Sequence, residues 1–192
     1  NMDVYKKLAV HLDNLPAGYP ATESGVELRI VKHLFTPEEA GIATSLTMVP
    51  ETPEAIAKRL GMDESQLSPT LEKMSKKGLI FRSSKGGLNH YMAAQFVVGI
   101  WEYHVNDLSE ELIRDFNEYI PYFMNKSWLE IKTKQLRVIP VSKSISAEMK
   151  IMPYEEAEKI INSQSKIVVS PCICRKEHRI MGKGCNEPLE VC

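Results

Sequence analysis

Residues 52–92 decide the fold of the N-terminal half, and they read TPEAIAKRLGMDESQLSPTLEKMSKKGLIFRSSKGGLNHYM. Thr52-Pro53-Glu54 is a helix-start signal, because threonine caps the first unpaired N–H groups and proline fits the first helical turn. The short helix that follows should end at Gly61, since glycine tolerates the left-handed conformation that is common after a helix. This first unit therefore predicts a helix over 55–60.

A second helix and two strands complete the stretch. Asp63-x-x-Gln66 is a capping box, and it opens a helix that should end at Lys76-Lys77-Gly78. Two short strand-like runs follow, separated by a polar turn that contains glycine, and they lie at 79–82 and 88–92. Helix, tight turn, helix and hairpin together predict a winged helix-turn-helix domain.

Apolar residues at helical spacing predict further helices on both sides of this domain, over 2–15, 26–34, from Thr36 onward, 94–103 and 108–124. In the helices expected over 94–103 and 108–124, the residues that should be buried in the core are Trp101, Leu112, Phe116, Ile120 and Phe123. Pro121 should end or kink the final helix, because proline lacks the N–H that the helix needs.

The pattern changes beyond residue 128. Short β-prone runs predict strands at 137–141 and 145–151, a helix at 153–161, and a buried strand at 166–170 that leads directly into Pro171-Cys172. We therefore expect an α+β, mostly helical chain. Its three parts are N-terminal helices plus the winged helix-turn-helix over 1–93, a helical connector over 94–130, and a small α+β module over 131–192 that ends in a cysteine-rich segment.

Composition excludes several classes of protein. The chain of 192 residues is 43% hydrophobic and 26% charged, as globular proteins usually are. No apolar run approaches the roughly 18 residues of a membrane span, and no signal region begins the chain, so we expect a cytoplasmic protein without membrane contact. The net charge of −1 lacks the basic excess that phosphate binding usually requires. The motifs of nucleotide-binding loops, serine hydrolases and zinc proteases are absent, so no catalytic role of its own is indicated.

The cysteines carry the strongest functional signal, because all four lie close together near the C-terminus, as Cys172, Cys174, Cys185 and Cys192. In a reducing compartment this clustering favours a metal site over disulfides. Four thiolates suit an iron–sulfur cluster or a structural zinc ion. Zinc ligands usually come in C-x₂₋₄-C pairs, which the chain lacks. A [4Fe–4S] cluster is therefore the leading interpretation, and zinc stays open as the alternative.

The residues between Cys174 and Cys185 suit an anionic cluster. Two glycines allow close backbone approach, and four cations would offset negative charge; they are Gly182, Gly184, Arg175, Lys176, Arg179 and Lys183. Arg175 either donates a hydrogen bond to the cluster or is solvated. His178 either replaces one thiolate or, more simply given four thiols, lies beside the ligands or in solvent.

The segment Pro171-Cys-Ile-Cys-Arg-Lys-Glu-His178, continued by Gly182-Lys-Gly-Cys185, Pro188 and Glu190-Val-Cys192, resembles a known group of proteins. The group comprises 4Fe–4S ferredoxin-type proteins of anaerobes, which have a winged-helix-like N-terminal region followed by C-x-C-R…G-x-G-C-x-x-P-x-x-x-C. The resemblance implies iron–sulfur binding and electron transfer, with the four cysteines as candidate ligands. Further ferredoxin-type cysteine motifs lie downstream in that group. This chain has none, so it reads as an N-terminal fragment.

A winged helix-turn-helix also raises the question of DNA binding. The helix after Asp63 would enter the major groove, with the wing near the phosphates, and the candidate contacts are Gln66, Ser68, Lys73, Lys76, Arg82 and Lys85. Pro69 and Glu72 lie on the same outward face and oppose this role, and the helix offers no arginine for guanine. Packing or protein interaction is therefore the preferred role of this domain, with DNA binding as the alternative.

The leading functional interpretation is an iron–sulfur electron-transfer protein. Its partner would be a redox protein, or downstream ferredoxin domains of the same chain, and a homodimer is compatible with the sequence. Two alternatives come from other classes: a winged-helix transcriptional regulator that senses an iron–sulfur cluster, and a zinc-stabilised protein-interaction module.

Overall fold

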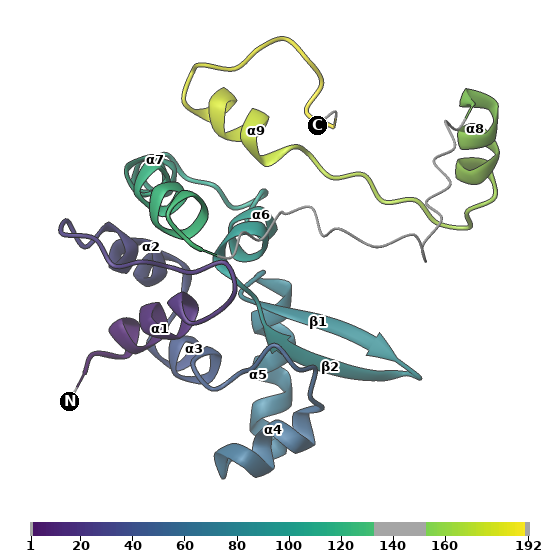
Figure 1. Cartoon of the computed structure of the whole chain (residues 1–192). Helices are drawn as coiled ribbons and strands as arrows, with labels where there is room; N and C mark the ends of the chain where they lie inside the picture. Colours follow the sequence, from purple (N-terminus) through teal and green to yellow (C-terminus); the bar gives the residue numbers. More distant parts are fainter. Residues whose placement is uncertain (1, 133–152, 191–192) are drawn as a thin grey trace, which may run out of the picture.

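The computed structural model describes residues 2–132 and 153–190. These residues form a mostly helical structure with one two-stranded antiparallel sheet, as the sequence predicts. Figure 1 traces the element order, which is α1 (Val4–Asp13), α2 (Val26–Leu34), α3 (Pro37–Ala43), α4 (Pro53–Leu60), α5 (Glu64–Lys76), β1 (Ile80–Lys85), β2 (Leu88–Ala93), η1 (Phe96–Ile100), α6 (Trp101–Tyr103), α7 (Glu110–Phe123), η2 (Met124–Leu129), α8 (Tyr154–Asn162) and α9 (Ile173–Ile180).

Side-chain caps set the starts of α3, α4 and α5. Thr36 and Glu39 form a full capping box at α3, and Thr52 accepts from the Ala55 N–H at α4. At α5 the Asp63 carboxylate accepts from Ser65, so the expected helix start is confirmed but the cap contacts a different residue than a Gln66 box implies. Gly61 ends α4 in the left-handed conformation, as expected.

The hairpin is confirmed, with a tighter turn than the sequence indicates. β1 and β2 pair from Ile80↔Ala93 to Lys85↔Leu88, which leaves only Gly86 and Gly87 between the strands. Both glycines have positive φ, at 60° and 81°, as a two-residue hairpin turn of the favoured twist requires. The five-residue turn over 83–87 that the sequence indicates is therefore wrong. Gly86 and Gly87 alone reverse the chain, so β1 continues to Lys85.

One aromatic cluster forms the centre of the helical body. Tyr19, Phe96 and Tyr119 make edge-to-face contacts at centroid distances of 4.8–5.9 Å, and Trp101 stacks on Phe116 at 3.7 Å. The expected core residues Trp101, Leu112, Phe116 and Phe123 are buried, while Ile120 is half-buried. The core is continuous from α1 to α7.

One helix prediction in this region requires correction. The expected helix over 94–103 is regular only over Trp101–Tyr103, because Val97, Val98 and Gly99 have non-helical dihedral angles. The β-branched valines and the glycine are poor helix formers, which explains why the apolar spacing misleads here. At Pro121, where the sequence predicts an end or a kink, α7 continues to Phe123, in agreement with the expected bounds of 108–124, and then passes into the π-helix η2.

The C-terminal part departs furthest from expectation. The helix expected at 153–161 is confirmed as α8, whereas the expected buried strand at 166–170 is irregular and exposed, with Val168 80% accessible. Within 2–132 and 153–190 no strand pairs with this run, and an apolar run without a partner strand does not form a sheet. The strands expected at 137–141 and 145–151 lie outside the described residues.

Among the helices of the described ranges, none combines the length and apolar character required to cross a lipid bilayer.

Candidate metal centre

The first two cysteines lie at the start of a helix. Cys172 is the N-cap residue of α9, and Cys174 is exposed in its first turn. The sequence places these cysteines directly after a buried strand, whereas in the structure they begin a helix. The residues after Cys172 repeat at helical spacing and place Ile173, Glu177 and Ile180 on one face. Burial of this face stabilises the segment as a helix.

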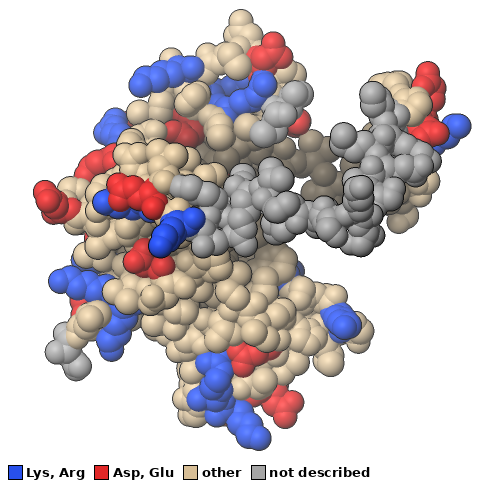
Figure 2. All heavy atoms as spheres, viewed as in Figure 1, with Lys and Arg blue, Asp and Glu red and all other residues tan. Residues whose placement is uncertain are grey.

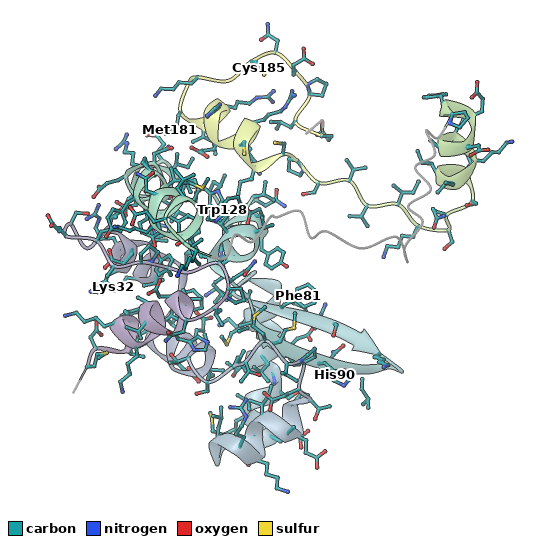
Figure 3. All side chains as sticks on the ribbon, in the orientation of Figure 1. Lys32, Phe81, His90, Trp128, Met181 and Cys185 are labelled. Carbon is teal, nitrogen blue, oxygen red and sulfur yellow. The ribbon has the colours of Figure 1, made fainter. Side chains whose placement is uncertain are left out.

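Helix α9 is attached to the helical body by that face. Ile173, Ile180 and Met181 pack against the core, and Figure 3 shows Met181 pointing toward α7. Glu177 is buried, and its carboxylate accepts a hydrogen bond from Asn117 Nδ2 of α7 at 2.9 Å. Lys176 Nζ donates to Asn106 Oδ1, also at 2.9 Å. The helix that carries Cys172 and Cys174 is thus fixed by apolar packing and two polar contacts.

The two glycines of the cysteine segment have structural roles at the other end of α9. Gly182 has φ +70°, and the N–H groups of Gly182 and Lys183 donate to the Arg179 and His178 carbonyls, which is a Schellman helix end. A Cβ on Gly184 would lie 2.9 Å from the Arg179 Cα, so the chain passes directly against the helix. Most of the residues between Cys174 and Cys185 are therefore helical, and the two glycines lie after the helix rather than beside a bound group.

The chain then returns along α9 toward Cys172. Leu189 O accepts from the backbone N–H of Cys172 at 2.6 Å, which joins the end of the segment to the start of the helix. Arg175 Nη1 donates to Pro188 O, and Arg179 Nη2 donates to Glu187 O, both at 3.3 Å. Arg175 is therefore neither simply solvated nor assigned to a cluster: its described contact is with the backbone.

The cysteines are only partly brought together. Cys172 and Cys174 lie at the N-terminal end of α9, whereas exposed Cys185 follows Gly184 at the C-terminal end, on the outer loop labelled in Figure 3. Within the described ranges no three His, Cys, Asp or Glu side chains gather closely enough to hold a metal ion. Cys192 lies outside the described residues, so the expected approach of all four sulfurs stays a prediction.

His178 lies on the side of α9 that faces α7. It is exposed on α9 and lines a groove of about 350 Å³ between α7 and α9, with Arg114, Asn117 and Lys183 among its neighbours. The groove faces α7 rather than the N-terminal turn with its two cysteines. Its position favours the interpretation of a solvent-facing histidine over a thiolate replacement.

The candidate DNA contacts are less available than the sequence indicates. Gln66 and Lys73 are exposed and Ser68 is half-buried, but Lys76 and Arg82 are held by Glu72 at 3.0 Å and 2.7 Å. The Arg82 and Lys76 cations, with a hydrogen bond from the Tyr91 hydroxyl, lower the pKa of Glu72 to about 2. The sequence identifies Glu72 as a negative charge that opposes phosphate. It does not reveal that Glu72 forms ion pairs with two of the candidate DNA-contacting cations.

The groove between α5 and the hairpin has the wrong charge for nucleic acid. Three glutamates line it, Glu54, Glu64 and Glu72, together with Ser68 and residues of the hairpin. Lys85 lies beside the turn, at the far end of β1. On the face seen in Figure 2, Lys and Arg are interspersed with Asp and Glu rather than gathered in one stripe. Phosphate binding needs an excess of cations along a continuous surface.

Comparisons of the chain with protein-family models, with curated proteins and with solved structures give no match.

Proposed function

We propose that this chain binds an iron–sulfur cluster, of the [4Fe–4S] type, through Cys172, Cys174, Cys185 and Cys192, and that it takes part in electron transfer. The observation that carries the proposal is the return of the Glu187–Leu189 segment to Cys172, whose N–H donates to the Leu189 carbonyl. The resemblance of this stretch to ferredoxin-type proteins of anaerobes supports the same conclusion.

The donor chemistry fits a soft, anionic inorganic group. Cys172 and Cys174 are separated by one residue at a helix N-terminus, where the positive end of the helix dipole favours negative charge. Four cations surround the stretch, and none of them pairs with a carboxylate in the described part of the chain: Arg175, Lys176, Arg179 and Lys183. When bound, the cluster would supply one-electron transfer, which no protein side chain here supplies.

The chain's own residues would hold and orient the cluster. The Glu177–Asn117 hydrogen bond and the apolar face of α9 fix the helix that carries two of the thiols. Exposure of Cys174 and Cys185 would leave the cluster near the surface, where a redox partner, or ferredoxin-type domains of a longer chain, could receive the electron. A zinc-stabilised module is the alternative on the same thiols.

We propose further that α4, α5 and the hairpin are a winged helix-turn-helix used for packing or protein interaction. The acidic groove beside α5 and the pairing of Lys76 and Arg82 with Glu72 support this role over DNA reading. A cluster-sensing regulator would instead need a cationic face, so binding to DNA separates the two proposals.

The test is anaerobic reconstitution with iron and sulfide, followed by absorption and electron paramagnetic resonance spectra of the oxidised and reduced protein. Serine replacements of Cys172 and Cys174 should each abolish or sharply reduce the cluster signal, because the pair shares one helical turn. His178→Gln, on the same helix, is the matched control and should load normally. Unchanged loading of both serine variants would refute the assignment.

A further inference from the structure

The groove between α7 and α9 has a volume of about 350 Å³. Its lining comes from both helices and from the residues directly after α9: Arg114, Asn117, Glu177, His178, Met181 and Lys183. This lining includes no cysteine, so the groove is separate from the proposed cluster site. Small-molecule sites in proteins commonly have volumes of about 300–1,000 Å³, so the groove is large enough for a small ligand.

The floor of the groove is a buried carboxylate. Glu177 is 6% exposed and still lines the groove. Asn117 Nδ2 donates to Glu177 Oε1 at 2.9 Å, and no group in 2–132 or 153–190 donates to Oε2. Because the Asn117 amide nitrogen faces the carboxylate, its carbonyl oxygen is a further acceptor. A buried carboxylate without a cationic partner is costly, so this floor suits an ammonium group.

The rim of the groove has the opposite charge. Arg114 pairs with Glu110 at 3.0 Å, but both side chains are more than half exposed, so solvent screens the pair and a ligand can replace Glu110 at little cost. The side chains of Lys183 and His178 have no hydrogen-bond or ion-pair partner among the residues that the structure describes. A guanidinium and an ammonium together are well suited to bind a carboxylate.

We propose that this groove binds an α-amino acid with a small aliphatic side chain. The ammonium group of the ligand donates to the Glu177 carboxylate and to the Asn117 carbonyl oxygen. Its carboxylate accepts from Arg114 and Lys183. The half-buried side chain of Met181, labelled in Figure 3, supplies apolar surface for the aliphatic part.

The charges of the groove favour a zwitterion over simpler ions. An inorganic anion would pair with the rim but leave Glu177 without a cation, and a simple amine would pair with Glu177 but face the cations of Arg114 and Lys183. An α-amino acid carries both charges a few bonds apart and satisfies both parts of the groove. The inference goes beyond the proposed electron transfer and does not depend on it, because no cysteine takes part.

Isothermal titration of the metal-free full chain with L-leucine and its deletion analogues measures the contribution of each charge. Isoamylamine is leucine without the carboxylate, and 4-methylpentanoate is leucine without the ammonium group. We expect each analogue to bind at least about tenfold more weakly than L-leucine, because each loses charge-assisted hydrogen bonds. Inorganic phosphate, which tests a plain anion site, should also bind more weakly than L-leucine.

Two replacements assign these charges to residues. Glu177→Gln keeps the shape of the side chain and should weaken L-leucine about tenfold without weakening 4-methylpentanoate. Arg114→Gln, at an exposed position where folding is not at risk, should weaken L-leucine about tenfold without weakening isoamylamine. Glu111→Gln on α7 and Lys126→Gln, which breaks an exposed ion pair of the same spacing, are the matched controls outside the groove and should not change the affinity.

Nuclear magnetic resonance locates the bound ligand. L-leucine should shift the side-chain amide resonances of Asn117 and the backbone amides of residues 177–183. The inference is overturned if L-leucine, L-valine and L-methionine all fail to bind at millimolar concentration, or if the shifts lie outside the groove. Binding of phosphate or isoamylamine as tight as that of L-leucine would also overturn it, since the groove would then recognise only one charge.

Discussion

The Glu72 carboxylate lies 2.7 Å from the Arg82 guanidinium, so a side chain of α5 holds the first strand of the hairpin. The same carboxylate contacts Lys76 at 3.0 Å and accepts a hydrogen bond from Tyr91 at 3.0 Å. Glu72 thus forms ion pairs with two of the cations that would otherwise be available to bind phosphate. It also joins both strands of the hairpin to the helix that would enter a DNA groove.

The wild-type chain should therefore give no sequence-specific footprint on DNA at physiological salt. Glu72→Gln should release Lys76 and Arg82 and produce weak, non-specific binding whose log–log salt slope steepens by up to about two units. Fluorescence anisotropy with a labelled duplex at several salt concentrations measures both quantities. Glu64→Gln removes the same charge from the same helix without freeing an ion-paired cation, so it should gain less affinity.

A reproducible wild-type footprint that Gln66→Ala or Ser68→Ala abolishes would contradict this prediction. It would assign α5 and the hairpin to DNA reading and favour the regulator over the redox protein.

Buried histidines should make the fold sensitive to mild acid. His104 is 5% exposed, and desolvation by burial lowers its pKa from 6.5. Its hydrogen bond to the Ile100 carbonyl and the nearby Asp107 carboxylate raise the pKa, whereas Lys77 and His33 lower it. The net pKa shift is downward. Because the folded-state pKa lies below the unfolded one, the unfolded chain binds more protons as the pH falls through 6.5. The free energy of unfolding should therefore decrease below that pH, by at most about 1.4 kcal/mol per pH unit for each such histidine.

Denaturant unfolding at several pH values between neutral and mildly acidic measures this slope. His104→Gln should reduce the slope, whatever its effect on stability at neutral pH, and His11, whose pKa burial also lowers, should account for part of the remainder. His90→Gln on the hairpin is the control. A slope that is identical in wild type and His104→Gln would show that the histidine is not responsible.

Gly184 should be required for docking of the cysteine segment. Alanine would place its Cβ 2.9 Å from the Arg179 Cα and 3.2 Å from its Cβ, and helix backbone cannot move away easily. We expect overpacking to cost about 1–3 kcal/mol of segment docking and to lower iron loading in the same variant. Hydrogen exchange over 172–190, with and without iron, is the measurement.

Gly41→Ala provides the comparison, because nothing lies within 4 Å of its added Cβ in α3. It should leave exchange in the cysteine segment unchanged and stabilise the helix by up to about 1 kcal/mol. Equal protection of the segment in Gly184→Ala and wild type would contradict the close approach.

Local signals in the sequence predict most of the N-terminal half. Thr36, Thr52 and Asp63 mark the starts of three helices through short-range caps, and Gly86-Gly87 marks the turn that the register confirms. These features depend on residues a few positions apart, so the sequence alone contains them. The wrong helix at 94–103 shows the limit, because apolar spacing does not reveal that Val97 to Gly99 interrupts it.

The sequence predicts the cysteine segment less well because the structure of that segment depends on distant contacts. The apolar run Ile167-Val168-Val169 matches a buried strand, but a strand exists only with a partner, and pairing is not visible in the run itself. The helical spacing of Ile173, Glu177 and Ile180 was available as a signal for α9. The hydrogen-bond donor to Glu177, Asn117 Nδ2, lies far away in the chain, and only the fold identifies it.

Iron and acid-labile sulfide stoichiometry of the anaerobically reconstituted full chain, with zinc measured in the same sample, tests the iron–sulfur assignment most directly. We predict about four irons and about four sulfides per chain, as for a [4Fe–4S] cluster, with no stoichiometric zinc. One zinc ion per chain, without iron or sulfide after anaerobic preparation, would contradict the assignment and identify the cysteines as a structural zinc site.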